Sequence, residues 1–399
     1  MSDLFHEQLQ ALRTQSLHRK LREIGSAQGP EIQIVGQQLV NFSSNDYLGL
    51  ANDSRLRDAA AAAIKEFGVG AGASRLISGT QSPHVRLEAA LAKWKGTEAA
   101  LCFSSGYAAA VGSIPALVGK QDIVLLDKLS HASLIDGARL SGAILRVFPH
   151  NHLGKLESHL EWTRREHPGR RVLIVTESVF SMDGDRASLQ QVIDLKKRFG
   201  ALLFLDEAHA VGVLGENGRG LAAELWLSDE VDVQMGTLSK ALGVSGGYIC
   251  GSRSLIEWLV NRARSFIFST APPPALAAAA LAAVEFLASA KGEERRQTLW
   301  QRIRVLRACL LPAAESSKIW NARLQNGSAI HPWMVGGEQA AIDLARALQN
   351  DGFLVPAIRY PTVAKGAARL RITVSAAHEE PQIQALGAAL SRHAQKSAS

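Results

Sequence analysis

The feature that most constrains the fold of this chain is a regular alternation of amphipathic and apolar stretches over its central part. From about residue 51 to residue 290, stretches with helical periodicity are followed by short apolar segments of strand length. Such strands between helices are typical of a mostly parallel sheet that helices cover on both faces. The sequence therefore predicts an α/β fold. The expected strands are AALCF, DIVLLD, AILRVF, RVLIVTES, ALLFLDE, DVQMGTL and GGYICG, and the expected helices include RLRDAAAAAIKEF, HVRLEAALAKW and SLQQVIDLKKRF.

The alternation stops on both sides of this central part, which predicts three regions. Residues 1–50 are expected to hold a helix over residues 4–24 that ends at Gly25, followed by short strands. Residues 51–290 form the large α/β domain. Residues 291–399 mix helices with strands such as RLRITVS, and we expect a smaller α+β domain there.

Composition and charge exclude several classes of protein. The three cysteines are scattered, without a disulfide framework or zinc-type spacing, so we expect a reducing compartment and no metal site. The first residues, MSDLFHEQLQALRTQ, lack the basic and apolar parts of a signal peptide, and the apolar run over 275–284 is too short for a membrane span. The net charge of +7 is spread without a basic stripe, which argues against nucleic acid. We expect a cytoplasmic protein that binds neither membrane nor nucleic acid.

An acidic residue ends one of the apolar strands, at the edge where α/β sheets bind ligands. The strand ALLFLD ends in Asp206, followed by Glu207 and His209. A buried charge there needs a partner, and a protonated pyridinium nitrogen is one. Capping of the next helix or coordination of magnesium would also explain Asp206. A helicase Walker B segment is excluded because no G-x-x-x-x-G-K-[ST] loop precedes it.

A lysine in an uncharged, glycine-flanked stretch is a second candidate for the same site as Asp206. Lys240 lies in GTLSKALGVSGG, between two apolar strands. Burial lowers the pKa of an ammonium group and makes the amine a nucleophile toward an aldehyde. Thr237 and Ser239 offer hydroxyls of the kind that hold a phosphate. Together with Asp206, Lys240 predicts a site for pyridoxal 5′-phosphate (PLP), although a structural lysine remains the alternative for this segment alone.

Other strand ends supply further candidates. The strand ALCF runs through FSSGY into a helix, so the N–H groups near Gly106 and Tyr107 can bind a phosphate, unless this is an ordinary helix cap. His131 follows DIVLLD and could lie flat on a cofactor ring, although a lone histidine there is more often structural. Glu177 and Ser181 follow another strand, and Ser181 offers a hydroxyl to the ring oxygen. The nearby aspartates, Asp183 and Asp185, could simply cap a turn.

These motifs resemble a known family when they are taken in order. The segments SSNDYLGL, FSSGY, DKLSHAS, ESVFSMDGD, LDEAHAVG, GTLSKALG and FSTAPPP resemble the α-oxoamine synthases over nearly the whole chain. These are fold-type I PLP enzymes that join an amino acid to an acyl thioester with loss of carbon dioxide. The resemblance implies an aspartate-aminotransferase-like fold, a PLP-dependent acyltransferase and a homodimer with active sites at the subunit interface.

The resemblance also implies roles for single residues. It makes Lys240 the Schiff-base lysine and catalytic group, Asp206 the partner of the pyridine nitrogen, and His131 the catalytic histidine stacked on the ring. Asn45 is implied near the substrate. The remaining implied cofactor contacts are His209 and Ser181 at the ring hydroxyl and Thr237, Gly106 and Tyr107 at the phosphate, with Ser269 and Thr270 at the phosphate of the neighbouring subunit. Glu177 is a further candidate cofactor contact because of its place at a strand end.

The C-terminal segment separates the activities of this family. The run IRYPTV resembles the members that condense L-alanine with a pimeloyl thioester in biotin biosynthesis, and it implies Arg359 and Thr362 at the substrate. An arginine suits this place because its fork binds a carboxylate through two hydrogen bonds. Arg19 is the implied second arginine, with Arg22 as the alternative. The pimeloyl group can be carried by acyl carrier protein or coenzyme A. The alternatives are the glycine-using ligase that forms 2-amino-3-ketobutyrate and the other members of the family.

Overall fold

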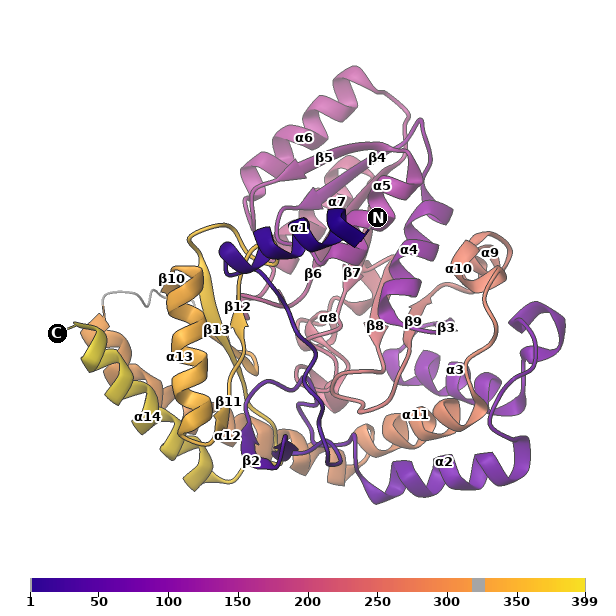
Figure 1. The fold of residues 1–399 in the computed structure, drawn as a ribbon. Helices are drawn as coiled ribbons and strands as arrows, with labels where there is room; N and C mark the ends of the chain where they lie inside the picture. Colours follow the sequence, from indigo (N-terminus) through magenta and orange to yellow (C-terminus); the bar gives the residue numbers. More distant parts are fainter. Residues whose placement is uncertain (1, 318–326, 399) are drawn as a thin grey trace. The chain divides into compact units, whose positions relative to one another are not determined.

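The structure, a computed structural model, describes residues 2–317 and 327–398 (Figure 1). The chain forms two compact units. Each is built from separate stretches of chain, and each is described by itself. Unit 1 comprises Met1–Gly49, Met182–Asp185 and Gln297–Ser399, and unit 2 comprises Leu50–Ser181 and Arg186–Arg296. The division into 1–50, 51–290 and 291–399 stays a prediction.

Unit 2 is built on a sheet of seven strands, as the alternating pattern predicts. Strands β4, β5, β6, β7 and β8 pair in parallel, while β9 runs antiparallel to both β8 and β3. The prediction of a mostly parallel sheet is confirmed. In spatial order the strands are β3 (Ala99–Phe103), β9 (Gly247–Gly251), β8 (Val233–Thr237), β7 (Leu202–Asp206), β6 (Val172–Glu177), β4 (Ile123–Asp127) and β5 (Ile144–Phe148).

Helices pack on this sheet because its central strands are apolar on both faces. Every residue of β4, β6, β8 and β9 is buried, and α4 and α5 pack against each other beside them. Helix α11, which contains the apolar run over 275–284, packs against α2 and α3. The helices are α2 (Ser54–Phe67), α3 (Ser82–Lys95), α4 (Gly106–Leu117), α5 (Ala132–Ser141), α6 (Leu153–Glu166), α7 (Leu189–Phe199), α8 (Leu221–Glu224), α9 (Arg253–Arg262), α10 (Arg264–Ile267) and α11 (Pro274–Leu287), with short turns η1 (Arg75–Gly79), η2 (Glu216–Gly218) and η3 (Ser228–Glu230).

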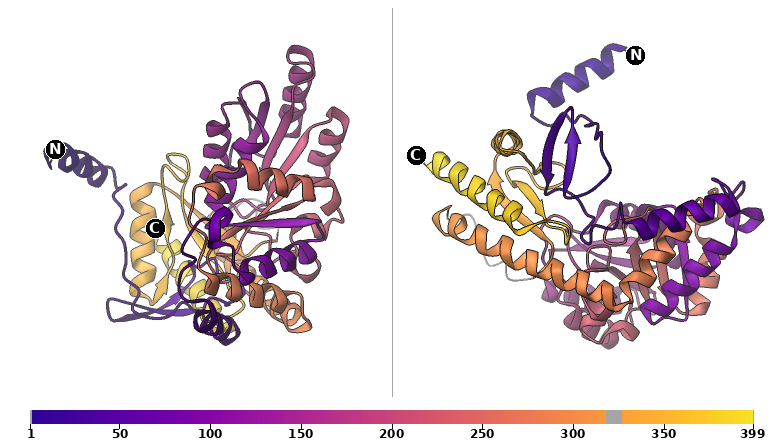
Figure 2. Two further views of the ribbon diagram at one scale, coloured as in Figure 1. Left: turned by 90° about the vertical axis from the view of Figure 1, so that its right-hand side faces the viewer. Right: turned by 90° about the horizontal axis from the view of Figure 1, so that it is seen from below.

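Unit 1 contains two three-stranded sheets and several helices. Strands β1 (Glu31–Ile34), β2 (Gln37–Asn41) and β11 (Phe353–Leu354) form one sheet, and β10 (Ile330–Gly336), β13 (Ala368–Thr373) and β12 (Ala357–Ile358) form the other. Helix α14 packs along α12 (Figure 2), closely enough that a Cβ on Gly387 would lie 2.5 Å from the Cβ of Cys309. The helices are α1 (Ser2–Thr14), α12 (Ala290–Ser317, which begins in unit 2), α13 (Glu338–Asn350) and α14 (Glu380–Ala398).

The short segment Met182–Asp185 is held inside unit 1 by two side chains. Arg369 on β13 donates to Asp183 Oδ1 at 2.9 Å, and both side chains are at least nine-tenths buried. The hydroxyl of Ser328 donates to the carbonyl of Gly184 at 2.7 Å. Asp183 is therefore one half of a buried ion pair, where the sequence suggested a turn cap.

The predicted helix over residues 4–24 is wrong at its end. Helix α1 ends at Thr14, and Ser16 takes a positive φ of 56°. The N–H groups of Leu17 and His18 donate back to the carbonyl of Leu12, at 2.8 and 3.1 Å, which closes the helix end. The helical periodicity beyond this point belongs to an irregular segment.

Within the described residues, no single helix is both long and apolar enough to cross a membrane. One bent pair, Pro274–Leu287 with Ala290–Leu311, meets the length and composition requirement only when its two helices are taken together, and they meet at 79°.

Candidate functional site

The candidate lysine lies where the chain reverses between two strands. Strand β8 ends at Thr237 and antiparallel β9 begins at Gly247, so Lys240 stands on their connection. Its Nζ atom lies 2.8 Å from Nε2 of His209, which follows β7 and is 5% exposed. The structure thus brings together two residues that the sequence predicts on the same cofactor.

Asp206 is the last residue of β7, as predicted, and it is 5% exposed. The backbone N–H of Ala208 donates to its Oδ1 at 2.8 Å. Burial raises the pKa of Asp206, and the positive charge of Lys240 opposes that rise. A carboxylate in this environment is stabilised by a cationic partner, and a protonated pyridine nitrogen is such a partner.

A second buried carboxyl group lies beside Asp206. Glu177 ends β6, is paired in register with Asp206, and accepts a hydrogen bond from the backbone N–H of His131. Burial raises the pKa of Glu177 well above its usual range, and the negative charge of Asp206 adds to that rise. Two buried carboxyl groups this close do not both ionise readily. Burial and the neighbouring charge of Asp206 therefore favour the protonated form of Glu177.

The turn from β3 into α4 has the geometry of an anion site. Ser105 caps α4, and its Oγ accepts the N–H of Ala108 at 3.0 Å. The N–H groups of Gly106 and Tyr107 lie in the first helical turn, which has no intrahelical carbonyl partners. A Cβ on Gly247 would lie 2.5 Å from the Ser105 carbonyl oxygen, so β9 passes this turn at a distance that only glycine permits.

Thr237, the other predicted phosphate contact, lies next to this turn. A Cβ on Gly106 would lie 3.5 Å from the Thr237 side chain. The Thr237 hydroxyl donates to the Gly246 carbonyl at 2.9 Å and lies 2.7 Å from the Oγ of Ser239, which is exposed. The chain therefore presents two adjacent hydroxyls, of which Ser239 is the more accessible.

The remaining predicted cofactor contacts surround the same strand ends. His131 caps α5, with Nδ1 accepting the Ser133 N–H at 3.2 Å, and the charges of Asp206 and Lys240 act on its ring. The hydroxyl of Tyr107 donates to Asp136 of α5 at 2.7 Å. Ser181 is 8% exposed and is the last residue of its stretch of unit 2.

Three of the four predicted substrate residues meet in unit 1. Nη2 of Arg19 lies 3.3 Å from the Thr362 hydroxyl, and Arg359 donates to the carbonyl of Ser16. Burial lowers the pKa of Arg359, and the positive charge of Arg19 lowers it further, while Glu338 opposes this. Two guanidinium groups this close favour an anion between or beside them. The alternative residue, Arg22, is exposed.

Asn45, the fourth predicted substrate residue, belongs to a separate group in unit 1. Its Oδ1 accepts the hydroxyl of Tyr47 at 3.3 Å, and Nη2 of Arg371 lies 3.5 Å from the same hydroxyl. Arg371 is 5% exposed. This buried guanidinium beside Tyr47 was not predicted from the sequence. The signal for it was a pair of arginines, Arg369 and Arg371, at alternate positions of an otherwise apolar strand.

Comparisons with known proteins identify the family of this chain. The family described as aminotransferase class I and II matches residues 37–390. An 8-amino-7-oxononanoate synthase of Anaeromyxobacter dehalogenans is 49% identical over 97% of this chain and 94% of its own length. One of Geobacter sulfurreducens is 46% identical over 96% of each chain.

A solved structure confirms the predicted fold class. A serine palmitoyltransferase of S. paucimobilis, determined with bound PLP-myriocin aldimine, is similar to this chain with a TM-score of 0.91 and 30% sequence identity, over 99% of this chain and 97% of that one. The likeness extends over both units, and the ordered motifs of the chain already resembled this group of enzymes. The chain belongs to the aminotransferase class I and II family and, within it, to the α-oxoamine synthases.

Proposed function

We propose that this chain catalyses the PLP-dependent condensation of L-alanine with a pimeloyl thioester. The products are 8-amino-7-oxononanoate, carbon dioxide and the free carrier, a step of biotin biosynthesis. The observation that carries the proposal is the group formed by Lys240, His209 and Asp206 at the strand ends of unit 2. The relatives named 8-amino-7-oxononanoate synthase, at 49% and 46% identity, support the choice of substrates.

The residues of unit 2 fit PLP at each of its functional groups. The buried carboxylate of Asp206, with its raised pKa, suits the pyridine nitrogen, and Lys240 suits the aldehyde. The first-turn N–H groups of α4 at Gly106 and Tyr107 suit the phosphate. When bound, PLP supplies the electron sink that stabilises a carbanion at the α-carbon of an amino acid.

The chain itself supplies the proton transfers and the charge stabilisation. The amine of Lys240, next to His209, removes the α-proton of alanine and later returns a proton to the product. Asp206 keeps a proton on the pyridine nitrogen throughout. His131 donates a hydrogen bond to the thioester carbonyl oxygen as negative charge develops there.

The substrates bind through the arginines of unit 1. The forked guanidinium of Arg359, with Arg19 and Thr362, holds the terminal carboxylate of the pimeloyl group. The buried guanidinium of Arg371, with Asn45, suits the carboxylate of alanine. The enzyme works as a cytoplasmic homodimer and takes the pimeloyl group from acyl carrier protein or coenzyme A.

One set of assays tests this proposal. Alanine and glycine are each combined with pimeloyl and acetyl thioesters, and carbon dioxide release is measured. We expect alanine with a pimeloyl donor to give the highest kcat/KM. A preference for glycine with the acetyl donor would assign the ligase activity instead, and release of no carbon dioxide with any pair would contradict the proposal.

A further inference from the structure

Helix α3 carries two charged side chains on one face, of which Lys95 is buried and Glu88 is half-buried. Glu88 and Lys95 are seven residues apart, which places them on nearly the same side of the helix and about 10 Å apart along its axis. Their side chains are 15% and 2% exposed. Charged residues are rarely this buried without a specific partner. Glu88 contacts a strand of the central sheet, and Lys95 contacts the residue that follows another strand.

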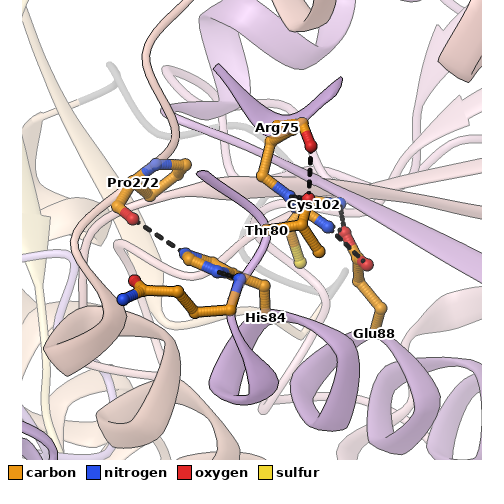
Figure 3. Close-up of polar contacts among 7 residues, drawn as sticks. Arg75, Thr80, His84, Glu88, Cys102 and Pro272 are labelled. Carbon is orange, nitrogen blue, oxygen red and sulfur yellow. Dashed lines mark hydrogen bonds and ion pairs between the residues drawn. The ribbon is translucent and has the colours of Figure 1, made fainter. Parts of the chain in front are cut away.

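Glu88 holds the strand that leads into the proposed phosphate turn (Figure 3). Its Oε1 accepts the backbone N–H of Cys102 at 2.9 Å. Cys102 belongs to β3, the edge strand of the sheet, so this N–H has no neighbouring strand to bind. Strand β3 ends one residue later, and the turn capped by Ser105 follows. Glu88 therefore fixes β3 from the side opposite β9.

Arg75 orients the Glu88 carboxylate. Nη1 and Nη2 of Arg75 donate to the two carboxylate oxygens, each at 2.9 Å, in the paired geometry that is strongest for this contact. Nε of Arg75 donates to the Thr80 hydroxyl at 2.9 Å, which holds the guanidinium in its turn, η1. Glu88 thus has both oxygens fixed and cannot leave Cys102 without breaking a buried ion pair.

The start of α3 is also fixed (Figure 3). Nδ1 of His84 accepts the backbone N–H of Gln81 at 3.1 Å, so Nε2 carries the ring proton and donates to the carbonyl of Pro272 at 2.8 Å. Desolvation lowers the pKa of His84 and keeps it in this neutral form. The helix that bears Glu88 and Lys95 is therefore anchored at its N-terminus.

Lys95 holds the residue that follows Asp206. Its Nζ lies 2.5 Å from Oε2 of Glu207, whose side chain is fully buried. Oε1 of Glu207 accepts the N–H of Ala222 at 3.0 Å, and a Cβ on Gly220 would lie 2.5 Å from the carboxylate oxygens. The backbone N–H of Glu207 donates to the carbonyl of Met235 in β8 at 2.9 Å. Glu207 is thus held on every side, directly after the candidate catalytic acid.

We propose that α3 sets the spacing of the cofactor site, with Glu88 positioning the phosphate turn and Lys95 positioning Asp206 through Glu207. The inference rests on the proposed PLP function. Glu88 and Lys95 are positioning residues, since neither contacts a reacting atom. Because they act at opposite ends of the cofactor, a change at one should alter the recognition of that end alone.

The first arm of the test concerns the phosphate. In Glu88→Gln, Arg75 loses its counter-charge and no longer fixes the orientation of the side chain that accepts the Cys102 N–H, so we expect the Kd for PLP to rise about tenfold. The Kd for pyridoxal, which lacks the phosphate, should change less than about twofold. Glu88→Asp, which can keep Arg75 but not Cys102, should show the same selective loss. Both constants are measured by absorbance titration of the cofactor-free full chain.

The second arm concerns the ring nitrogen. Lys95→Met leaves the Glu207 charge uncompensated beside Asp206, so the pH midpoint of the bound cofactor's absorbance change should rise by about one unit. Glu207→Gln leaves Lys95 uncompensated, and the midpoint should fall by about the same amount. The double variant should return toward the wild-type midpoint. Opposite shifts from the two single variants would not follow from general loosening of the fold.

Control variants and contrary outcomes complete the test. Glu157→Gln removes an exposed acid paired with Arg198 on the surface of the same unit, and it should change neither readout. Two outcomes would overturn the positioning roles. The first is an equal loss of affinity for PLP and for pyridoxal in Glu88→Gln and Glu88→Asp. The second is a shift of the pH midpoint in the same direction in Lys95→Met and Glu207→Gln. A wild-type chain that binds no PLP would overturn the proposed function as well. A wild-type chain that binds PLP and releases carbon dioxide, with unaffected variants, would overturn this inference alone.

Discussion

The two units of the molecule hold their functional charges in different ways. In unit 2, Asp206 and Glu177 end buried strands and are 5% and 2% exposed. In unit 1, Arg19 and Thr362 are exposed and Arg359 is half-buried. Charges interact far more strongly in a buried site than in water. Unit 2 therefore raises the pKa of its two carboxyl groups, whereas unit 1 presents accessible hydrogen-bond donors at Arg19 and Thr362 to an incoming anion.

This difference suits unit 2 to the proton transfers and unit 1 to the recognition of the substrate. Proton transfer at a carbon atom needs groups whose proton affinity is adjusted, and burial provides the adjustment. Recognition of a carboxylate at the end of a flexible chain needs accessible hydrogen-bond donors of fixed shape. We expect changes in unit 2 to act on kcat and changes in the unit 1 arginines to act on KM.

The largest expected effect is at Lys240. Lys240→Ala should lower kcat about 10⁴-fold or more, because it removes both the cofactor attachment and the proposed base. Initial rates of carbon dioxide release check this. Lys128→Ala, at an exposed lysine of the same unit, is the control and should keep its activity. Full turnover by Lys240→Ala would refute the assignment.

The next effect distinguishes the units by their response to acid. In unit 1, burial lowers the pKa of His378 to about 4 and that of His331 to about 3. For a group with a lowered pKa, the stabilisation is present above the unfolded value and is lost as the pH falls. As the pH falls from about 6.5 to about 4, His378 alone should lower the free energy of unfolding of unit 1 by about 3 kcal/mol.

The buried carboxyl group of Glu177 in unit 2 should respond in the opposite sense in the cofactor-free chain. Burial raises the pKa of Glu177, so its stabilisation is fully present below the unfolded value and is lost as the pH rises through the folded one. Hydrogen exchange over the acid range should therefore show β10 and β13 losing protection before β6 and β7. His378→Phe, which keeps the stacking on Phe42, should reduce the difference. Simultaneous loss in both units would contradict the comparison.

A smaller effect is expected at Arg359. Arg359→Ala should raise KM for the pimeloyl thioester about 30-fold, the value of one charge-assisted contact, with kcat changed less than about threefold. A thioester without the terminal carboxylate should bind wild type and variant equally. If kcat fell as much as kcat/KM, Arg359 would belong to the chemistry and not to recognition.

The smallest effect decides between two neighbouring arginines. Arg19→Ala should raise the same KM about fivefold, since Arg19 is exposed and its contact with Thr362 is long at 3.3 Å. Arg22→Ala should leave KM unchanged. The reverse result would move the second substrate arginine to Arg22.

Local patterns in the sequence predicted most of unit 2. The strand that ends at Asp206 and the connection that carries Lys240 were found because short apolar runs between helices are a local signal. The order of the motifs then identified the family. The roles of the single site residues stay predictions, because they depend on a bound cofactor and substrates.

Long-range contacts account for what the sequence did not predict. Helix α1 ends at Thr14 because the chain turns at Ser16, whose side chain donates to Gln339 at 2.7 Å and whose carbonyl accepts from Arg359. Asp183 pairs with Arg369, 186 residues away. Hydrophobic periodicity carries no information about partners that are distant in the sequence. From the sequence alone, an aspartate in a buried ion pair therefore looks the same as one that caps a turn.

The placement of Met182–Asp185 has a consequence for how this protein can be divided or inherited. These four residues belong to unit 1 although the chain on both sides of them belongs to unit 2. A gene fragment for residues 50–296 would still encode Asp183 but not Arg369, and the acid would lose the guanidinium that compensates it. Trimming the ends therefore separates the two partners of this ion pair, and recombination that exchanged only the C-terminal stretch of chain would take the two charges from different parents.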